Sequence, residues 1–167
     1  IGTPVFLESG GRPLCRVTDL IIDPENGKIA AFSVSPANKK LISPMDIRAW
    51  TNQIVIRSHD DIVGSEDLLR ANEIMEMQRP ILKNKVYSQK NGDYLGKVYD
   101  YVVHSELLVL KKIYVAKSIL GLAHFDGRII PYKAIYEILP KKIIVNTDAE
   151  LFEEDKDDQK AFEFGRA

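Results

Sequence analysis

The sequence predicts a mainly β protein in which two small β-barrels follow one another along the chain, connected by an α-helix. Three observations support this fold: the second half repeats the first, short apolar runs alternate with turn-forming residues, and one stretch between the halves has helical spacing. The repeat matters most, because an internal period usually defines the whole architecture. The expected parts are a first barrel, a helical linker, a second barrel and an acidic tail, at residues 1–62, 63–81, 82–148 and 149–167.

The repeat becomes visible when the chain is shifted by 81 residues, which places residues 11–23 on residues 92–104. Four aligned positions are then identical, namely Gly11/Gly92, Leu14/Leu95, Val17/Val98 and Asp19/Asp100. Further on the shift grows to 88, and residues 43–47 fall on residues 131–135. The second copy therefore has additional residues in the loop before Pro131, and surface loops are where insertions are best tolerated.

Each copy is expected to form short strands separated by turns rich in Gly, Pro, Asn and Asp. The strands are predicted at residues 4–7, 15–22, 29–34, 40–42 and 54–56, and again at 84–88, 96–103, 110–115, 128–130 and 143–145. Strands this short favour a closed barrel, because closure leaves no unprotected edge. A unit of about 60 residues is only marginally stable alone. We therefore expect the two barrels to pack with pseudo-two-fold symmetry, as a monomer or as a homodimer.

A helix is predicted between the copies, from Ser65 to Gln78. Ser65 is a suitable N-cap, and the two acids that follow it favour the first turn electrostatically. Apolar residues recur at helical spacing, and Pro80 ends the pattern; they are Leu68, Ala71 and Met75. We expect this helix to lie on one of the barrels as a linker, and the alternative is a helix that binds a partner.

A family resemblance is carried by the second copy of the repeat. Residues 92–103 read Gly-x-x-Leu-Gly-Lys-Val-x-Asp-x-Val-Val, which resembles the opening of a PRC-barrel domain. The turn at residues 23–28 and the proline steps at residues 42–44 and 129–131 are also similar to that family. Two departures stand out: Cys15 occupies a position where the pattern has Gly, and Leu107-Leu108 replaces the Asn26-Gly27 turn.

The resemblance implies a docking role. The family includes the cytoplasmic part of the photosynthetic reaction-centre H subunit and the C-terminal domain of the ribosome maturation factor RimM, and its members generally dock on larger protein or ribonucleoprotein assemblies. The two-copy form looks most like stand-alone bacterial proteins of this family. The RimM arrangement itself, with its different N-terminal domain, is not recognisable in this sequence.

Catalytic, cofactor-binding and metal-binding residues are not expected. The histidines are widely separated (His59, His104 and His124), and neither a phosphate-binding P-loop nor a dinucleotide-binding glycine pattern occurs. His59 is expected at the polar end of a closing strand. Asp19 and Asp100 are expected to accept backbone hydrogen bonds or to pair with Arg16 and Lys97. Cys15, the single cysteine, is expected to act as a small buried apolar residue.

Charge is distributed unevenly along the chain, whose formal net charge is −1. Residues 146–167 contain eight acids and three bases, a net −5, and the remaining 145 residues contain 16 acids and 20 bases, a net +4. The tail is expected to be a solvated end or an acidic-aromatic docking motif. No apolar run reaches the roughly 20 residues of a membrane helix, no signal peptide is recognisable, and the single cysteine fits a reducing compartment. These features predict a cytoplasmic protein.

Two candidate partner surfaces follow from these patterns. The first is apolar and combines a turn with the inserted loop of the second copy, at Leu107, Leu108, Ile119, Leu120, Leu122 and Phe125. Exposed apolar segments often mark partner sites, although these residues would equally serve internal packing. The second is basic, with lysine pairs at residues 39–40, 111–112 and 141–142 near Lys83 and Lys85. Nucleic-acid binding would require these lysines on one surface together with aromatic residues. The sequence therefore predicts a non-enzymatic adaptor that binds a protein partner or a ribonucleoprotein, and the alternative is a ribosome- or RNA-associated maturation factor.

Overall fold

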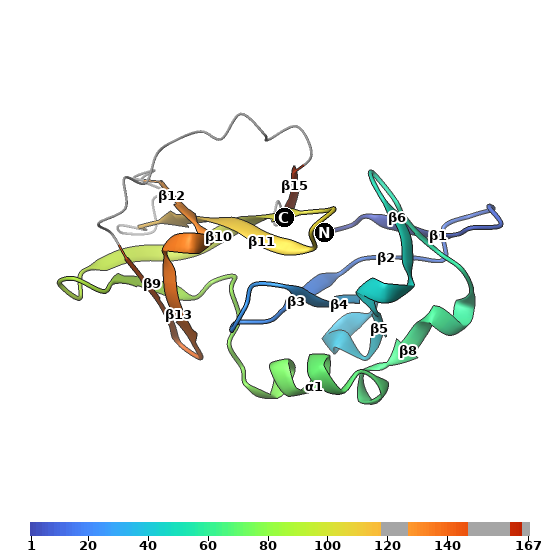
Figure 1. The fold of residues 1–167 in the computed structure, drawn as a ribbon, viewed down its shortest axis with the longest axis horizontal. Helices are drawn as coiled ribbons and strands as arrows, with labels where there is room; N and C mark the ends of the chain where they lie inside the picture. Colours follow the sequence, from blue (N-terminus) through green and yellow to red (C-terminus); the bar gives the residue numbers. More distant parts are fainter. Residues whose placement is uncertain (118–126, 147–160, 165–167) are drawn as a thin grey trace. The chain divides into compact units, whose positions relative to one another are not determined.

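The computed structural model describes residues 1–117, 127–146 and 161–164, and in these residues the chain is mainly β with one α-helix (Figure 1). This confirms the mainly β prediction. Two compact units divide the chain. Unit 1 consists of Ile1–Asp23, Lys28–Met77 and Ser105–Leu108. Unit 2 consists of Pro24–Gly27, Gln78–His104 and the chain from Val109 onward.

Unit 1 contains two four-stranded sheets, ordered β2-β1-β7-β6 and β3-β4-β5-β8. Strands β1 and β7 pair in parallel, and the other pairs are antiparallel. The strands are β1 (Pro4–Leu7), β2 (Cys15–Arg16), β3 (Asp19–Ile22), β4 (Ile29–Ser33), β5 (Lys40–Ile42), β6 (Ile47–Trp50), β7 (Ile54–Ile56) and β8 (Ile62–Gly64). The sequence did not predict strands β6 and β8.

Unit 2 contains one larger sheet, ordered β12-β11-β10-β9-β14-β13, with β15 paired to β10. The strands are β9 (Lys85–Ser88), β10 (Tyr94–His104), β11 (Val109–Ala116), β12 (Arg128–Pro131), β13 (Ile135–Leu139), β14 (Lys142–Val145) and β15 (Ala161–Phe164). The long strand β10 corresponds to β2 and β3 of unit 1, which Val17 and Thr18 separate. The same stretch of the repeat therefore builds one sheet in unit 2 and joins two sheets in unit 1.

The prediction of closed barrels is wrong, because the strand pairs form open sheets. Within the described residues, the first and last strands of each sheet do not pair with one another, so none of the sheets closes. Short strands limit the exposed edges instead, since those of unit 1 have only two to five residues. Register shifts also bend β10 against β9 and β11, and such bulges twist a sheet without closing it.

The strand registers recur between the units at the shifts found in the sequence. Strands β1 and β2 pair Val5 with Cys15, and β9 and β10 pair Val86 with Gly96, 81 residues later. The parallel pairs also correspond, because Val5 lies opposite Ile54 and Val86 lies opposite Ile143, which follows Ile54 by 89 residues since the second copy has one more residue in the turn before this strand. The central antiparallel pairs agree as well, with Phe32 opposite Ile42 and Ile113 opposite Ile130.

The cores of the two units occupy equivalent positions of the repeat. In strands such as β9 and β14 alternate residues point inward, as a period of two requires, whereas consecutive residues of β3 and of the second half of β10 are buried. Val5, Phe32, Ile42 and Ile54 are fully buried in unit 1, and their counterparts in unit 2 are buried equally well, namely Val86, Ile113, Ile130 and Ile143. On β9 and β14 the opposite face carries Lys85, Tyr87 and Lys142, and this outward face of unit 2 is where the candidate site lies.

The helix is shorter than predicted and begins later. Helix α1 spans Leu69–Glu76, and residues 65–67 form a separate 3-10 turn. The Asp67 carboxylate accepts a hydrogen bond from the Gly64 amide at 3.1 Å, so this turn is capped by Asp67 and Ser65 is not the N-cap of the helix. On the inner side of α1, Ala71 and Ile74 pack against the β3-β4-β5-β8 sheet of unit 1. The helix therefore lies on one of the two units, as expected for a linker helix.

Candidate functional site

The predicted apolar surface is described only at its turn. Leu107 is 67% exposed, whereas Leu108 is half-buried and its carbonyl accepts a hydrogen bond from the Ile29 amide at 2.8 Å. Leu108 has a φ of 55°, and Gly27, its counterpart in the repeat, has a φ of 71°. The left-handed turn is thus kept although Gly is replaced. The other candidates lie outside the described residues: Ile119, Leu120, Leu122 and Phe125.

The basic pairs are brought together only in part. Lys39 and Lys40 belong to unit 1, and the other two pairs belong to unit 2. In unit 2, Lys142 lies directly opposite Lys85 across strands β14 and β9, and Lys85 lies directly opposite Lys97 across β9 and β10. Residues directly opposite one another share a face of a sheet. Lys97, Lys85 and Lys142 therefore form one row across three strands, which we call the lysine row.

The lysine row lies on the outward face of the sheet. All three lysines are exposed, and their neighbours Val86, Val98 and Ile143 are buried. Strands are spaced about 4.8 Å apart, so the row spans about 10 Å between its outer Cα atoms. Like charges placed directly opposite one another destabilise a sheet. The row is thus a concentrated positive surface that does not stabilise the sheet.

Tyrosines lie on both sides of the lysine row. Tyr87, two residues after Lys85, lies opposite Tyr94, three residues before Lys97 across the register shift, and the two ring centroids are 5.5 Å apart. In the other direction Tyr99, which is 49% exposed, stands two residues from Lys97, and its ring is 6.0 Å from that of Tyr114. The ammonium group of Lys112 lies 5.8 Å from the centre of the Tyr114 ring. Cations and aromatic rings are therefore interleaved along this face.

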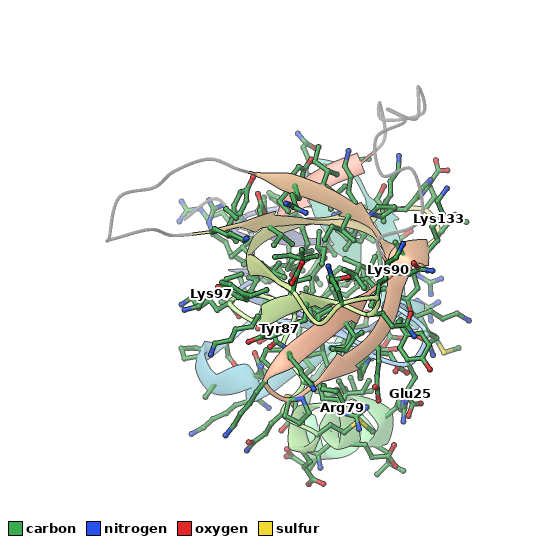
Figure 2. All side chains as sticks on the ribbon, turned by 90° about the vertical axis from the view of Figure 1, so that its left-hand side faces the viewer. Glu25, Arg79, Tyr87, Lys90, Lys97 and Lys133 are labelled. Carbon is green, nitrogen blue, oxygen red and sulfur yellow. The ribbon has the colours of Figure 1, made fainter. Side chains whose placement is uncertain are left out.

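Two shallow grooves follow the same face. The larger, of about 560 Å³, runs between β9 and β14 and is lined by Lys85, Tyr87, Ser88, Gln89, Gly92, Lys141, Lys142 and Ile144. The smaller, of about 390 Å³, is lined by Ser88, Asn91, Asp93, Tyr94, Leu95, Lys117 and Arg128. Figure 2 is turned toward this part of unit 2, with Tyr87, Lys90 and Lys97 labelled. Ser88 borders both grooves, so together they form one open surface rather than an enclosed pocket.

The first copy of the repeat lacks the lysine row. At the same positions it has Pro4, Arg16 and Gln53, so only one of the three carries a positive charge. The difference extends to the whole halves. Residues 78–146 contain 12 bases and 5 acids, a net +7, whereas residues 1–77 contain 8 bases and 11 acids, a net −3. Sequence reasoning treated Lys97 only as a possible partner of an aspartate and did not single out the tyrosines.

The repeated aspartates serve the backbone. An Asp19 oxygen accepts a hydrogen bond from the Leu20 amide, and an Asp100 oxygen accepts one from the Tyr101 amide, both at 2.8 Å. This confirms the backbone role predicted for them. Burial raises the pKa of Asp19, while the hydrogen bond from Leu20 acts in the opposite direction. Arg16, one of the predicted partners, donates to the Gly2 carbonyl at 2.8 Å.

The residues around His59 form a capped turn, so the prediction of a strand end there is wrong. His59–Asp61 is a 3-10 helix, and the Asp61 carboxylate accepts hydrogen bonds from the amides of Arg57 and Ser58 at 2.8 and 3.0 Å. His104 ends strand β10, and His124 lies outside the described residues. Cys15 is half-buried, and burial raises the pKa of its thiol. Among the described residues, no three His, Cys, Asp or Glu side chains are grouped so that they could hold a metal ion.

Comparison with known proteins points to one family. Residues 1–63 match the model of the PRC-barrel domain, which is the family that the sequence motifs resemble. The comparison with curated proteins gave no match. Within the part of the chain that the structure describes, no helix is both long enough and apolar enough to span a bilayer.

Proposed function

We propose that this chain is a tandem PRC-barrel-type docking protein of the cytoplasm, without catalytic activity, which binds an anionic macromolecule through the lysine row. The match of residues 1–63 supports the family for the first copy. The recurrence of strand registers in unit 2 supports a second copy at residues 82–148. The backbone roles of Asp19 and Asp100 support a docking role rather than carboxylate catalysis.

The lysine row carries this proposal. The fold does not require it, because the first copy also pairs β1 with β2 and with β7, although Pro4 and Arg16 replace two of the lysines and Gln53, directly before β7, replaces the third. Three ammonium groups on one exposed row repel one another, and a bound anionic surface removes this repulsion. The row is therefore better explained by a partner than by the stability of the sheet.

Binding to immobilised heparin, a polyanion, tests the proposal. The triple variant Lys85→Gln, Lys97→Gln and Lys142→Gln removes the lysine row, and its three side chains are exposed, so folding should be unaffected. A control variant removes three exposed cations of unit 1 by Arg12→Gln, Lys39→Gln and Lys40→Gln. We expect the row variant to elute at clearly lower salt than the wild type, with the control eluting close to the wild type. Equal elution of the two variants would show that net charge alone governs retention and would refute the proposal.

The exposed apolar side chain of Leu107 supports a second docking surface, for a protein partner. This surface would combine Leu107 and Leu108 with Ile119, Leu120, Leu122 and Phe125. Partner capture from native lysate, with identification by mass spectrometry, should be lost in Leu107→Ser and in the double variant Ile119→Ser and Leu122→Ser. Leu69→Ser is a matched control, because Leu69 is 75% exposed on helix α1. Unchanged capture by both test variants would remove this surface from the proposal.

A further inference from the structure

We infer that the ligand of this face is a single-stranded nucleic acid, whose phosphates lie along the lysine row and whose bases stack on the neighbouring tyrosines. The inference rests on the proposed function, because it requires that an anionic partner binds at the lysine row. It goes further by naming the partner's chemistry and by assigning a role to each kind of side chain on the face.

The lysine row suits a linear polyanion. Each lysine offers three donors and no acceptor, and the three Cα atoms follow one line across β10, β9 and β14. A nucleic-acid strand carries one negative charge per nucleotide, spaced by about 3.4 Å along the axis of a regular helix and further apart where the strand is extended. Each of the three lysines can therefore meet one phosphate of a strand that runs along this row of about 10 Å. Lys141 continues the basic surface at the edge of the larger groove.

The tyrosines distinguish a nucleic acid from an acidic protein. Carboxylates need only cations, and the lysine row alone would satisfy them. Tyr94 and Tyr99 are 38% and 49% exposed and stand on either side of Lys97 along strand β10. Aromatic side chains beside a basic track are the arrangement on which successive bases stack, and such stacking tolerates any base. The pairing of exposed rings with the lysine row therefore favours bases attached to phosphates.

The same geometry favours a single strand over a duplex. Bases in a duplex are stacked on one another, and their flat faces cannot reach side chains on an open sheet. Here the rings belong to a sheet face with shallow grooves, so the bases must be free to turn toward it. Of the described acids, Asp93 lines the smaller groove from the β9–β10 turn, beyond Tyr94 from the lysine row, and Glu137 lies on β13 opposite Ile144. A strand that follows the row thus avoids both carboxylates.

The first experiment measures how salt affects the binding of the full chain to a fluorescent oligouridylate of about 12 nucleotides, a length within the usual site range. Each phosphate contact contributes about −0.7 to the slope of log affinity against log salt for single strands. We expect the triple variant of Lys85, Lys97 and Lys142 to make this slope shallower by about 2. The unit 1 control with Arg12, Lys39 and Lys40 replaced should keep the wild-type slope. An unchanged slope in the row variant would overturn the inference.

The second experiment tests stacking with the paired variants Tyr94→Leu/Tyr99→Leu and Tyr94→Phe/Tyr99→Phe. Loss of base stacking should weaken binding roughly tenfold or more in the leucine variant. The phenylalanine variant should bind like the wild type, and both should keep the wild-type salt slope. A purely structural role for these exposed tyrosines would not separate the two variants. Equal weakening in both, or weakening in neither, would therefore overturn stacking.

Competing ligands complete the test and separate the inference from the proposed function. Oligothymidylate that binds as well as oligouridylate supports the inference, and a preference between them shows whether RNA or DNA is bound. Duplex RNA or polyglutamate of equal charge that binds as tightly as the single strand would overturn the inference. If that binding still depends on the lysine row, the proposed function survives. No binding of any polyanion at low salt would overturn both.

Discussion

Replacing Gly96 with alanine should destabilise unit 2 substantially, although it adds a single methyl group. Gly96 lies in strand β10 at a register shift against β9, with a φ of 136°. Residues with a side chain rarely adopt this conformation. A Cβ atom at this position would overlap the carbonyl group of Ala116 and would lie 3.0 Å from the Lys117 amide nitrogen. Both neighbours are backbone atoms, so the clash cannot be relieved by a change of rotamer.

Two contributions set the expected magnitude. Holding a residue with a side chain in a sparsely populated backbone region costs about 1–3 kcal/mol. Forcing an additional carbon into a packed site costs about another 1–3 kcal/mol. The free energy of unfolding should therefore fall by about 2–6 kcal/mol, a large part of the stability of an ordinary domain. With a typical slope of about 2 kcal/mol per molar urea, the unfolding midpoint should fall by about 1–3 M.

The repeat supplies the control for this prediction. Cys15 occupies the equivalent position in unit 1, and its φ is not positive. Cys15→Gly should therefore lower the stability by only about 1 kcal/mol, mainly through the added freedom of the unfolded chain. Urea unfolding followed by far-ultraviolet circular dichroism measures both variants. The reasoning is refuted if Gly96→Ala unfolds within about 0.5 kcal/mol of the wild type, which is the range of a harmless surface change.

Three further predictions concern unit 1. Because burial raises the pKa of Asp19, the folded protein binds this proton more tightly than the unfolded chain, so its contribution to stability decreases as pH rises above about 4. Asp19→Asn should flatten the pH profile of the urea midpoint in that window, and an unchanged profile would contradict this role. Burial also raises the pKa of the Cys15 thiol, so iodoacetamide at pH 8 should react with the native protein more slowly than with free cysteine. The reaction should reach the rate of free cysteine only in urea. Alkylation of the native protein at the rate of free cysteine would contradict this prediction. Arg70 donates two hydrogen bonds to the buried carboxylate of Asp23, at 2.8 and 3.0 Å. Arg70→Ala should therefore lower the free energy of unfolding by about 1–3 kcal/mol. This loss is smaller than for a fully buried ion pair, because the Arg70 side chain is 43% exposed. Glu73 forms an exposed ion pair with Arg70, so Glu73→Ala should change the free energy of unfolding by less than about 0.5 kcal/mol. Thermal or urea unfolding measures both variants, and equal losses of stability in Arg70→Ala and Glu73→Ala would contradict this prediction.

Much of the strand pattern could be predicted from the sequence because both halves of the chain carry the same pattern. A side chain in a strand faces inward or outward according to a period of two, so Val5 and Val86 at equivalent positions imply the same buried face. The shift of 81 residues then gives the same register for β1–β2 and β9–β10. The backbone role of Asp19 and Asp100 followed in the same way, since both stand at the same point of the repeat.

Barrel closure and the start of the helix could not be predicted in this way. Whether a sheet closes depends on bulges and strand breaks, such as the interruption at Val17 and Thr18, which leave no distinct mark in the residue pattern. Ser65 has the side chain of an N-cap, but Asp67 caps the preceding turn and α1 begins only at Leu69. The sequence pattern correctly predicted a helix in this region, but the hydrogen bond from Gly64 to Asp67 caps a separate turn, so the helix starts later than predicted.

The lysine row also lay beyond sequence reasoning. Lys97 and Lys142 are separated by 45 residues and come together only through the registers of β9 with β10 and of β14 with β9. Lys141 and Lys142 are adjacent in the sequence, but nothing in the residue pattern joins them to Lys97. The repeat aligns Val5 with Val86 but does not say which strands are neighbours, so the row becomes visible only when the strand pairs are known.

Neither unit is a continuous piece of chain, and this has a consequence for folding. Ser105–Leu108 belongs to unit 1, and Pro24–Gly27 belongs to unit 2. The hydrogen bond from Ile29 to Leu108 in unit 1 therefore joins residues that are 79 positions apart. Such distant contacts slow folding, because a long loop must close before the contact is made. A polypeptide cut near residue 78 would deprive each fragment of a turn that its own unit needs. We therefore expect the separate halves to fold poorly and to recover a native spectrum only when they are mixed.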